Sequence, residues 1–154
     1  MKALFLAISL VAVSGLLTAA LAQERKIQQN ELPAAVQATV AKESAGAVIK
    51  GFTKEKEKGI QTYEAEMVVG GRTRDVSMDA QGNILEIEQE VSFDSLPDSV
   101  RSALTKAAGS GKITKIESFT KNGRLVAYEA QVKGGIRHRE IQVGPNGEKL
   151  KHEE

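Results

Sequence analysis

Hydrophobic residues recur at helical spacing in two short stretches of the chain, and each stretch opens with a leucine-proline pair. The apolar positions are Leu32, Val36, Val40, Leu96, Val100 and Leu104. Pro33 and Pro97 suit the first position of a helix, where a missing N–H costs nothing. The spacing therefore predicts one helix after each proline, with a single apolar stripe, ended by the small residues that follow.

The rest of each half alternates between apolar and polar residues with a period of two, which is typical of half-buried β-strands. In residues 63–69 the odd positions hold Tyr, Ala, Met and Val, whereas the even positions hold Glu, Glu and Val. Asn122-Gly123 separates two such runs and is the strongest short-range signal for a hairpin turn. We therefore expect antiparallel strands with one face against a helix and the other in water.

One sequence pattern occurs twice in the chain. Residues 63–89 align without gaps onto residues 128–154. The matching pairs include Tyr63/Tyr128, Glu64/Glu129, Ala65/Ala130, Gly70/Gly135, Arg72/Arg137, Arg74/Arg139, Gly82/Gly147 and Leu85/Leu150. We predict an α+β fold of two tandem units, each with one helix followed by a four-stranded antiparallel meander. The helices are expected to pack on one face of the sheet or sheets. The units are expected at residues 23–92 and 93–154.

The first 22 residues have a different composition from the rest of the chain. They contain a basic start, an apolar run over residues 3–17 and the sequence Ala-Leu-Ala at residues 20–22. This order is typical of a secretory signal peptide, which we expect to be cleaved after Ala22. An uncleaved membrane anchor is the alternative, because about 20 apolar residues can span a bilayer. The mature chain is expected to be periplasmic or secreted and outside the membrane.

Composition and charge narrow the function classes. The chain is 27% charged and 41% hydrophobic, as ordinary globular proteins are. Loss of residues 1–22 removes one of the 21 basic residues and none of the 20 acidic ones, so the mature chain is formally neutral. A neutral chain lacks the basic field that drives nucleic-acid binding, and we expect no nucleic-acid partner. The absence of cysteine excludes disulfides, cysteine-based zinc sites and thiol nucleophiles.

Several short motifs together resemble the PepSY-like domains of exported bacterial proteins. The motifs are Leu32-Pro33, Tyr63-Glu64-Ala65, the arginine-rich strand start at residues 72–74 and the Asp-x-x-Gly turn at residues 79–82. The resemblance covers essentially the whole mature chain. It implies a fold related to that of the beta-lactamase inhibitory protein, in which tandem helix-plus-sheet units set their sheets side by side. It also implies a non-enzymatic binding or inhibitory module of the cell envelope.

Period-two parity places a set of carboxylates on the outward face of the first predicted sheet. They are Glu64, Glu66, Asp75, Glu86, Glu88 and Glu90. The corresponding positions of the second half are more mixed, since they include Gln131 and Lys151. Closely spaced carboxylates suit a basic peptide or a hard cation such as calcium. The alternative is an ordinary solvated sheet face whose charge serves solubility.

Two pairs of arginines recur at the starts of matching strands. They are Arg72, Arg74, Arg137 and Arg139. A functional interpretation has them gripping a carboxylate or phosphate, which the planar guanidinium can bind through two hydrogen bonds. A structural interpretation has their stems covering the core edge while the heads contact acidic neighbours or the carbonyls at a helix end.

Metal and catalytic patterns are weak in this sequence. His138 and His152 are the only histidines, so a zinc site would have to borrow carboxylates such as Glu140. No serine lies in a Gly-x-Ser-x-Gly turn, and we expect neither an enzyme nor a cofactor. Two functions stay open: a module that binds or inhibits an envelope protein or peptide, and a protein that buffers a small ligand or divalent cation on the acidic face.

Overall fold

The computed structural model describes residues 24–57 and 59–152, and the predicted signal segment lies outside them. The described elements follow in the order β1 (Arg25–Ile27), η1 (Gln29–Glu31), α1 (Ala34–Glu43), β2 (Ala47–Glu57), β3 (Ile60–Val69), β4 (Arg72–Asp79), β5 (Ile84–Glu90), η2 (Phe93–Ser95), α2 (Asp98–Ala108), β6 (Lys112–Lys121), β7 (Arg124–Gly134) and β8 (Arg137–Val143). No helix in the described part of the chain is long and apolar enough to cross a membrane.

Both predicted helices form where the apolar spacing places them. Each begins one residue after its proline, and the carbonyl of that proline accepts the first helical hydrogen bond. The predicted hairpin turn at Asn122-Gly123 also forms, with both residues at positive φ between β6 and β7. The local sequence therefore specifies where these elements begin and turn, and packing of the apolar stripes against the sheet stabilises the two helices.

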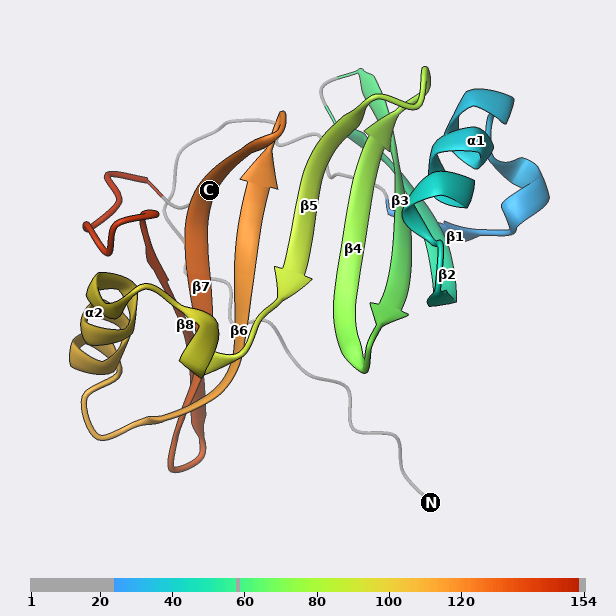
Figure 1. Ribbon diagram of the computed structural model, residues 1–154. Helices are drawn as coiled ribbons and strands as arrows, with labels where there is room; N and C mark the ends of the chain where they lie inside the picture. The colour runs from blue at the N-terminus through green and yellow to red at the C-terminus, as the bar shows by residue number, and fades with distance from the viewer. Residues whose placement is uncertain (1–23, 58, 153–154) are drawn as a thin grey trace, which may run out of the picture.

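All eight strands belong to one antiparallel sheet, in the order β1 to β8 (Figure 1). The two halves of the chain join where β5 pairs with β6, from Glu86 opposite Lys121 to Glu90 opposite Glu117. Helix α1 lies over the β1 end of the sheet and α2 over the β8 end (Figure 1). The described residues thus form a single open sheet with two helices on one face.

This architecture corrects the predicted fold. The expectation of two tandem units, each with a helix and a four-stranded meander, is wrong. The described residues form one continuous sheet, in which five strands precede α2 and three follow it. The short strand β1, which the sequence pattern did not indicate, adds to the edge of β2 through Arg25–Ile27.

The strand expected after β8 is missing for a reason that the aligned residues explain. The chain makes the same turn in both halves, because Asp79 N bonds Asn83 O and Gly144 N bonds Glu148 O. After the first turn, Ile84 and Ile87 of β5 pack against the core. The residues aligned with them are polar, namely Lys149 and His152. A strand there would bury two polar side chains, and residues 149–152 form none.

The apolar core has two clusters, one under each helix. Val36 and Val40 of α1 pack with Ala65, Met67 and Val76 of the sheet in the first cluster. The second cluster joins the α2 residues Val100, Leu104 and Ala108 to the sheet residues Ile116, Ala130, Val132 and Val143. Each cluster belongs to a half of roughly 60 residues, a size at which a lone domain is marginally stable. The shared sheet therefore lets each half support the other.

Aligned glycines in the two halves bring a turn close to the start of each helix. Gly82 has φ of +78°, and a Cβ placed there would lie 2.6 Å from the carbonyl oxygen of Ala35 in α1. Gly147 has φ of +83°, and its Cβ would lie 2.5 Å from the carbonyl oxygen of Ser99 in α2. These turns therefore hold each helix against the sheet at a distance that only glycine allows.

Substitution of Gly82 by alanine tests this close approach. The control is Gly71→Ala, because Gly71 has φ of +84° but no atom lies within 4 Å of the place that a Cβ would take there. We expect Gly71→Ala to lower the free energy of unfolding by about 1 kcal/mol, the cost of a positive φ. Gly82→Ala should cost roughly 1–3 kcal/mol more, because its methyl group must displace α1. Urea unfolding of both variants measures the difference, and equal losses would contradict the close approach.

Candidate functional site

The sheet face opposite the helices carries the predicted carboxylates. We call this surface the acidic face, and it comprises Glu64, Glu66, Asp75, Glu86, Glu88 and Glu90. The residues come from β3, β4 and β5, and all six are partly exposed. Their neighbours along each strand, such as Ala65 and Val76, are fully buried beneath the helices. The parity argument therefore placed all six side chains on the correct face.

Three of these carboxylates form a row across the strands. Glu66 lies directly opposite Asp75, and Asp75 lies directly opposite Glu88. Residues directly opposite in an antiparallel pair have Cβ atoms about 5 Å apart, and like charges at such positions destabilise a sheet. Within the described residues, none of the three lies within ion-pair distance of a basic side chain. The charge of Lys115 lowers the pKa of Asp75, so the row is a line of acidic groups that is only partly neutralised.

The row and its surroundings shift the pKa of several carboxyl groups upward. Burial, followed by the negative charges of Glu86 and Glu117, raises the pKa of Glu88 to about 7. The pKa of Asp75 is raised first by burial and then by the charge of Glu66. Burial and the charge of Asp75 likewise raise the pKa of Glu64. A cation placed over this face would reverse these effects, because it would favour the ionised carboxylates.

The remaining acidic positions have local partners that hold their side chains in place. Glu90 accepts hydrogen bonds from the backbone N–H of Thr73 at 3.1 Å and from its hydroxyl at 3.3 Å. Ser77 donates from its hydroxyl to Glu64 at 3.3 Å. Glu86 lies 3.7 Å from the ammonium group of Lys121, at the far end of the same face. Glu86 therefore has a cation nearby, whereas Glu64 and Glu90 are held by hydrogen bonds from neutral groups.

Strand β6 extends this face with residues that the sequence argument missed. Glu117 is only 6% exposed, and its carboxylate lies 2.6 Å from the ammonium group of Lys115. Phe119 is 7% exposed and lies opposite Glu88. The period-two pattern of residues 115–119 does indicate that these side chains share one face of the sheet. Their place beside Glu88 became visible only through the pairing of β5 with β6.

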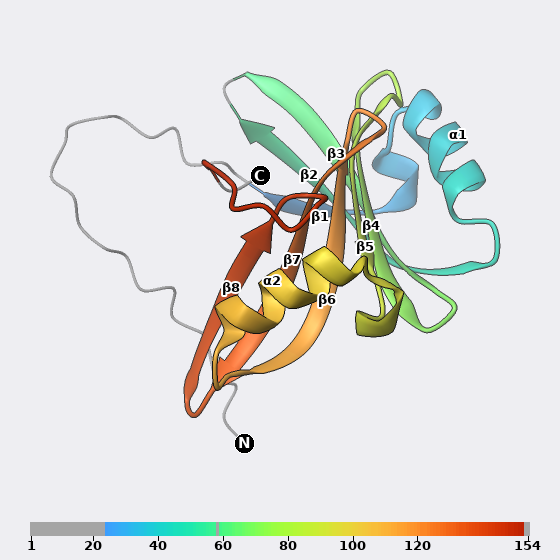
Figure 2. The same cartoon turned by 60° about the vertical axis from the view of Figure 1, so that its left-hand side comes forward.

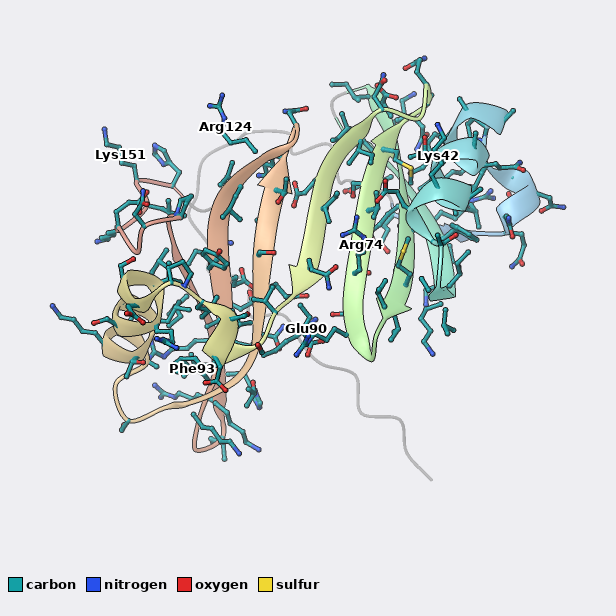
Figure 3. All side chains as sticks on the ribbon, in the orientation of Figure 1. Lys42, Arg74, Glu90, Phe93, Arg124 and Lys151 are labelled. Atoms are coloured by element: carbon teal, nitrogen blue, oxygen red, sulfur yellow. The ribbon has the colours of Figure 1, made fainter. Side chains whose placement is uncertain are left out.

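Two of the four predicted arginines belong to the opposite, helix-covered face. Arg74 lies over β4 (Figure 3), and its guanidinium is 2.6 Å from the carboxylate of Glu43 at the end of α1. It also donates to the side-chain oxygen of Gln89 on β5 at 3.2 Å. Arg139 donates to the carbonyl oxygens of Ala107 and Ala108 at the end of α2, at 2.9 and 2.7 Å. These contacts support the structural interpretation of both residues.

The other predicted polar residues do not gather into a site. Arg72 and Arg137 are exposed at the first positions of β4 and β8, away from the acidic row. His138 and His152 are exposed as well. Across residues 24–57 and 59–152, no three His, Cys, Asp or Glu side chains are arranged so that they could hold a metal ion. The acidic face therefore offers a line of charge rather than a coordination cage.

Comparison with solved structures identifies the fold. The chain is similar to a candidate periplasmic protein from Bacteroides eggerthii, with a TM-score of 0.65 and 19% identity over 78% of this chain and 86% of the other. It is also similar to a DUF2874 family protein from Bacteroides ovatus, with a TM-score of 0.60 and 19% identity over 78% and 85% of the two chains. A BLIP-like protein from Bacteroides fragilis gives a TM-score of 0.58 and 24% identity over 77% and 83%.

The matched regions cover most of each chain, but sequence identities of 19–24% do not carry function from one protein to another. They show that the fold is the one found in DUF2874 family proteins and in a protein described as BLIP-like. The sequence itself matches no family model and no curated relative. The chemistry of the acidic face must therefore be argued from its own residues.

The raised pKa of Glu88 predicts how stability depends on pH. Between the ordinary value of 4.5 and the folded value of about 7, the folded protein binds more protons than the unfolded chain. The free energy of unfolding should therefore fall as the pH rises through this window. Replacement Glu88→Gln should remove that loss and raise the free energy of unfolding by about 1 kcal/mol at pH 8, after allowance for partial exposure.

The same substitution should have little effect at pH 5, where Glu88 is already protonated in the folded protein. Urea unfolding at pH 5 and pH 8 measures both values. The variant Glu140→Gln, on exposed residue Glu140 of β8, controls for the loss of one negative charge elsewhere on the sheet. A stabilisation of equal size at both pH values would contradict the proposed protonation of Glu88.

Proposed function

We propose that this chain is a non-catalytic, exported PepSY-like module that binds a protein or peptide partner of the cell envelope on its acidic face. The partner is expected to present basic side chains in an extended or flat surface. Binding of this kind would inhibit a partner whose bound surface is needed for its other contacts. The proposal concerns the mature chain after removal of residues 1–22.

The observation that carries the proposal is the row of Glu66, Asp75 and Glu88. Three carboxylates directly opposite one another weaken the folded protein, since their charges repel and none has a basic neighbour within ion-pair distance among the described residues. A surface that lowers stability in this way gains from a ligand that supplies positive charge. Lysine or arginine side chains from a partner would relieve the repulsion and restore ordinary ionisation of Glu88.

The class and location of the proposed module rest on two further observations. The leucine-proline helices and the Tyr-Glu-Ala strand resemble PepSY-like domains of exported proteins. The fold is shared with a candidate periplasmic protein and with a protein described as BLIP-like. Together with the predicted signal segment, these similarities support an envelope location and a binding function.

Geometry favours a basic polypeptide over a bound divalent cation. A calcium ion needs six to eight oxygen ligands gathered around one point. The carboxylates of the acidic face are spread along a line that crosses β3, β4 and β5, and the described residues contain no cluster suited to a metal. A polypeptide strand with basic side chains at alternate positions fits such a line better.

A charged model peptide tests the proposal directly. We expect a short labelled peptide of alternating lysine and valine to bind the mature chain more tightly than the same peptide with glutamate in place of lysine. The double variant Asp75→Asn/Glu88→Gln should weaken binding by about tenfold or more, a loss of roughly 1.4 kcal/mol, because the centre of the row becomes neutral. Fluorescence anisotropy at physiological salt measures both affinities.

A matched double variant separates the acidic face from overall charge. Asp94→Asn/Glu148→Gln removes one aspartate and one glutamate at exposed positions outside the acidic face. This control should retain the affinity of the unsubstituted protein. Equal weakening by both double variants would show that only net charge matters and would defeat the proposal.

A further inference from the structure

A groove runs along the free edge of the sheet beside β8. It has a volume of about 630 Å³ and lies between β8 and α2, which contacts that strand (Figure 2). Its lining includes Ala103, Lys106, Ala107, Ile141, Val143 and Lys149. In the described part of the chain, β8 pairs with β7 on one side and with no strand on the other. The groove therefore combines an apolar floor with a strand edge that no described strand covers.

The first half of the molecule shows what occupies the matching position there. Strand β4 aligns with β8, and its outer edge is covered by β5. Ile87 lies opposite Val76, Ile84 lies opposite Met78, and both isoleucines pack against the core under α1. Arg74 then contacts Gln89 from the same added strand. An extended strand with apolar side chains on the helix-facing side completes this half.

Within residues 24–57 and 59–152, no strand covers the outer edge of β8. Lys149 and His152 stand at the positions aligned with Ile84 and Ile87, and residues 149–152 adopt no strand. Arg139, which aligns with Arg74, contacts only the end of α2 and is exposed. The second half thus has an edge, a groove and an arginine like those of the first half, but no described strand covers them.

We propose that β8 accepts an extended segment of a partner polypeptide, which adds to the sheet as a ninth strand and fills the groove beside α2. Such strand addition gains affinity from main-chain hydrogen bonds and specificity from the pockets that receive alternate side chains. The site lies at the sheet edge and under α2, so it is separate from the acidic face on which the proposed function rests.

The register of β4 with β5 predicts the chemistry of the partner segment. Transferred to β8, it places apolar side chains opposite Ile141 and Val143, as in the pairs Val76/Ile87 and Met78/Ile84. It also places one residue opposite Glu140, where a lysine or arginine would be favourable and an acid would not. The residue opposite Arg139 should be an amide or an acid, as Gln89 is opposite Arg74. The expected segment therefore carries apolar residues opposite Val143 and Ile141 and a basic residue opposite Glu140. Its next residue, opposite Arg139, is an amide or an acid.

Strand β5 itself provides the probe. We would titrate the full mature chain with two labelled peptides, one with the sequence of residues 83–91 and one with the same sequence carrying Glu88→Lys. We expect the lysine peptide to bind more tightly, by about tenfold, because it places a base rather than an acid opposite Glu140. Hydrogen exchange should show new protection of the backbone amides of Arg137–Val143.

A charge swap on the protein makes this test specific. The variant Glu140→Lys should reverse the preference and favour the peptide with glutamate, whereas Asp75→Asn/Glu88→Gln in the protein should leave it unchanged. An Ile87→Ser change in the lysine peptide should abolish binding, because the groove loses its apolar contact. No binding up to about 1 mM, no reversal, or protection of the acidic face instead of β8 would each overturn the proposal.

A second variant tests whether the chain's own residues 149–152 can be made to occupy the groove. Lys149→Ile/His152→Ile restores the apolar pair found in β5, so the chain's own segment should add to β8. We expect protection of the Arg137–Val143 amides without peptide and at least tenfold weaker binding of the lysine peptide. The control Lys149→Ser/His152→Ser removes the same side chains and should bind as the unsubstituted protein does. Unchanged affinity in the isoleucine variant would contradict strand addition at this edge.

Discussion

The backbone pairing of β5 with β6 is the interaction on which the rest of this structure depends. It joins two halves of roughly 60 residues, each with its own helix and its own apolar cluster, into one sheet. A half of that size buries too little surface to be comfortably stable alone. Pairing removes one free edge from each half and lets the two clusters lie side by side beneath α1 and α2. It is also the only strand pair in the described residues that links sequence before α2 to sequence after it.

The same pairing shapes the electrostatics of the open face. Glu88 on β5 has Asp75 as its neighbour on one side and Phe119 of β6 on the other. The charge of Glu117, also on β6, helps to raise the pKa of Glu88, although the two residues are 29 positions apart in sequence. If the halves were separate, β5 would be an edge strand and water would screen its carboxylates. The repulsion within the acidic row arises in β3, β4 and β5, and the pairing with β6 adds the charge of Glu117.

Sequence patterns predicted the local features well because short-range physics determines them. Helical spacing and the two prolines located the start of both helices to within a residue. The period-two parity placed the six carboxylates of the acidic face on the side of the sheet opposite the helices. The patterns could not reveal that β5 pairs with β6, because a period of two specifies which face a residue occupies and not which strand lies beside it. The sequence therefore did not show that Lys115, Glu117 and Phe119 of β6 extend the acidic face. Strand β1 has only three residues, too few for any periodic signal.

The missing strand after β8 was foreseeable, and its absence gives the molecule its asymmetry. The alignment of the two halves emphasised identical residues such as Gly82 and Gly147, which do hold matching turns against the helices. It overlooked the replacement of Ile84 and Ile87 by Lys149 and His152, which removes the apolar contacts that hold a strand on the core. Edge strands are usually blunted by charge or covered by other segments. The charged residues of β8 are Arg137, Arg139 and Glu140, and an apolar groove lies between the strand and α2, so the proposed strand addition would let this edge select among partners. In the proposed strand addition, a contact that is internal in the first half of the chain becomes, in the second half, a contact with a partner.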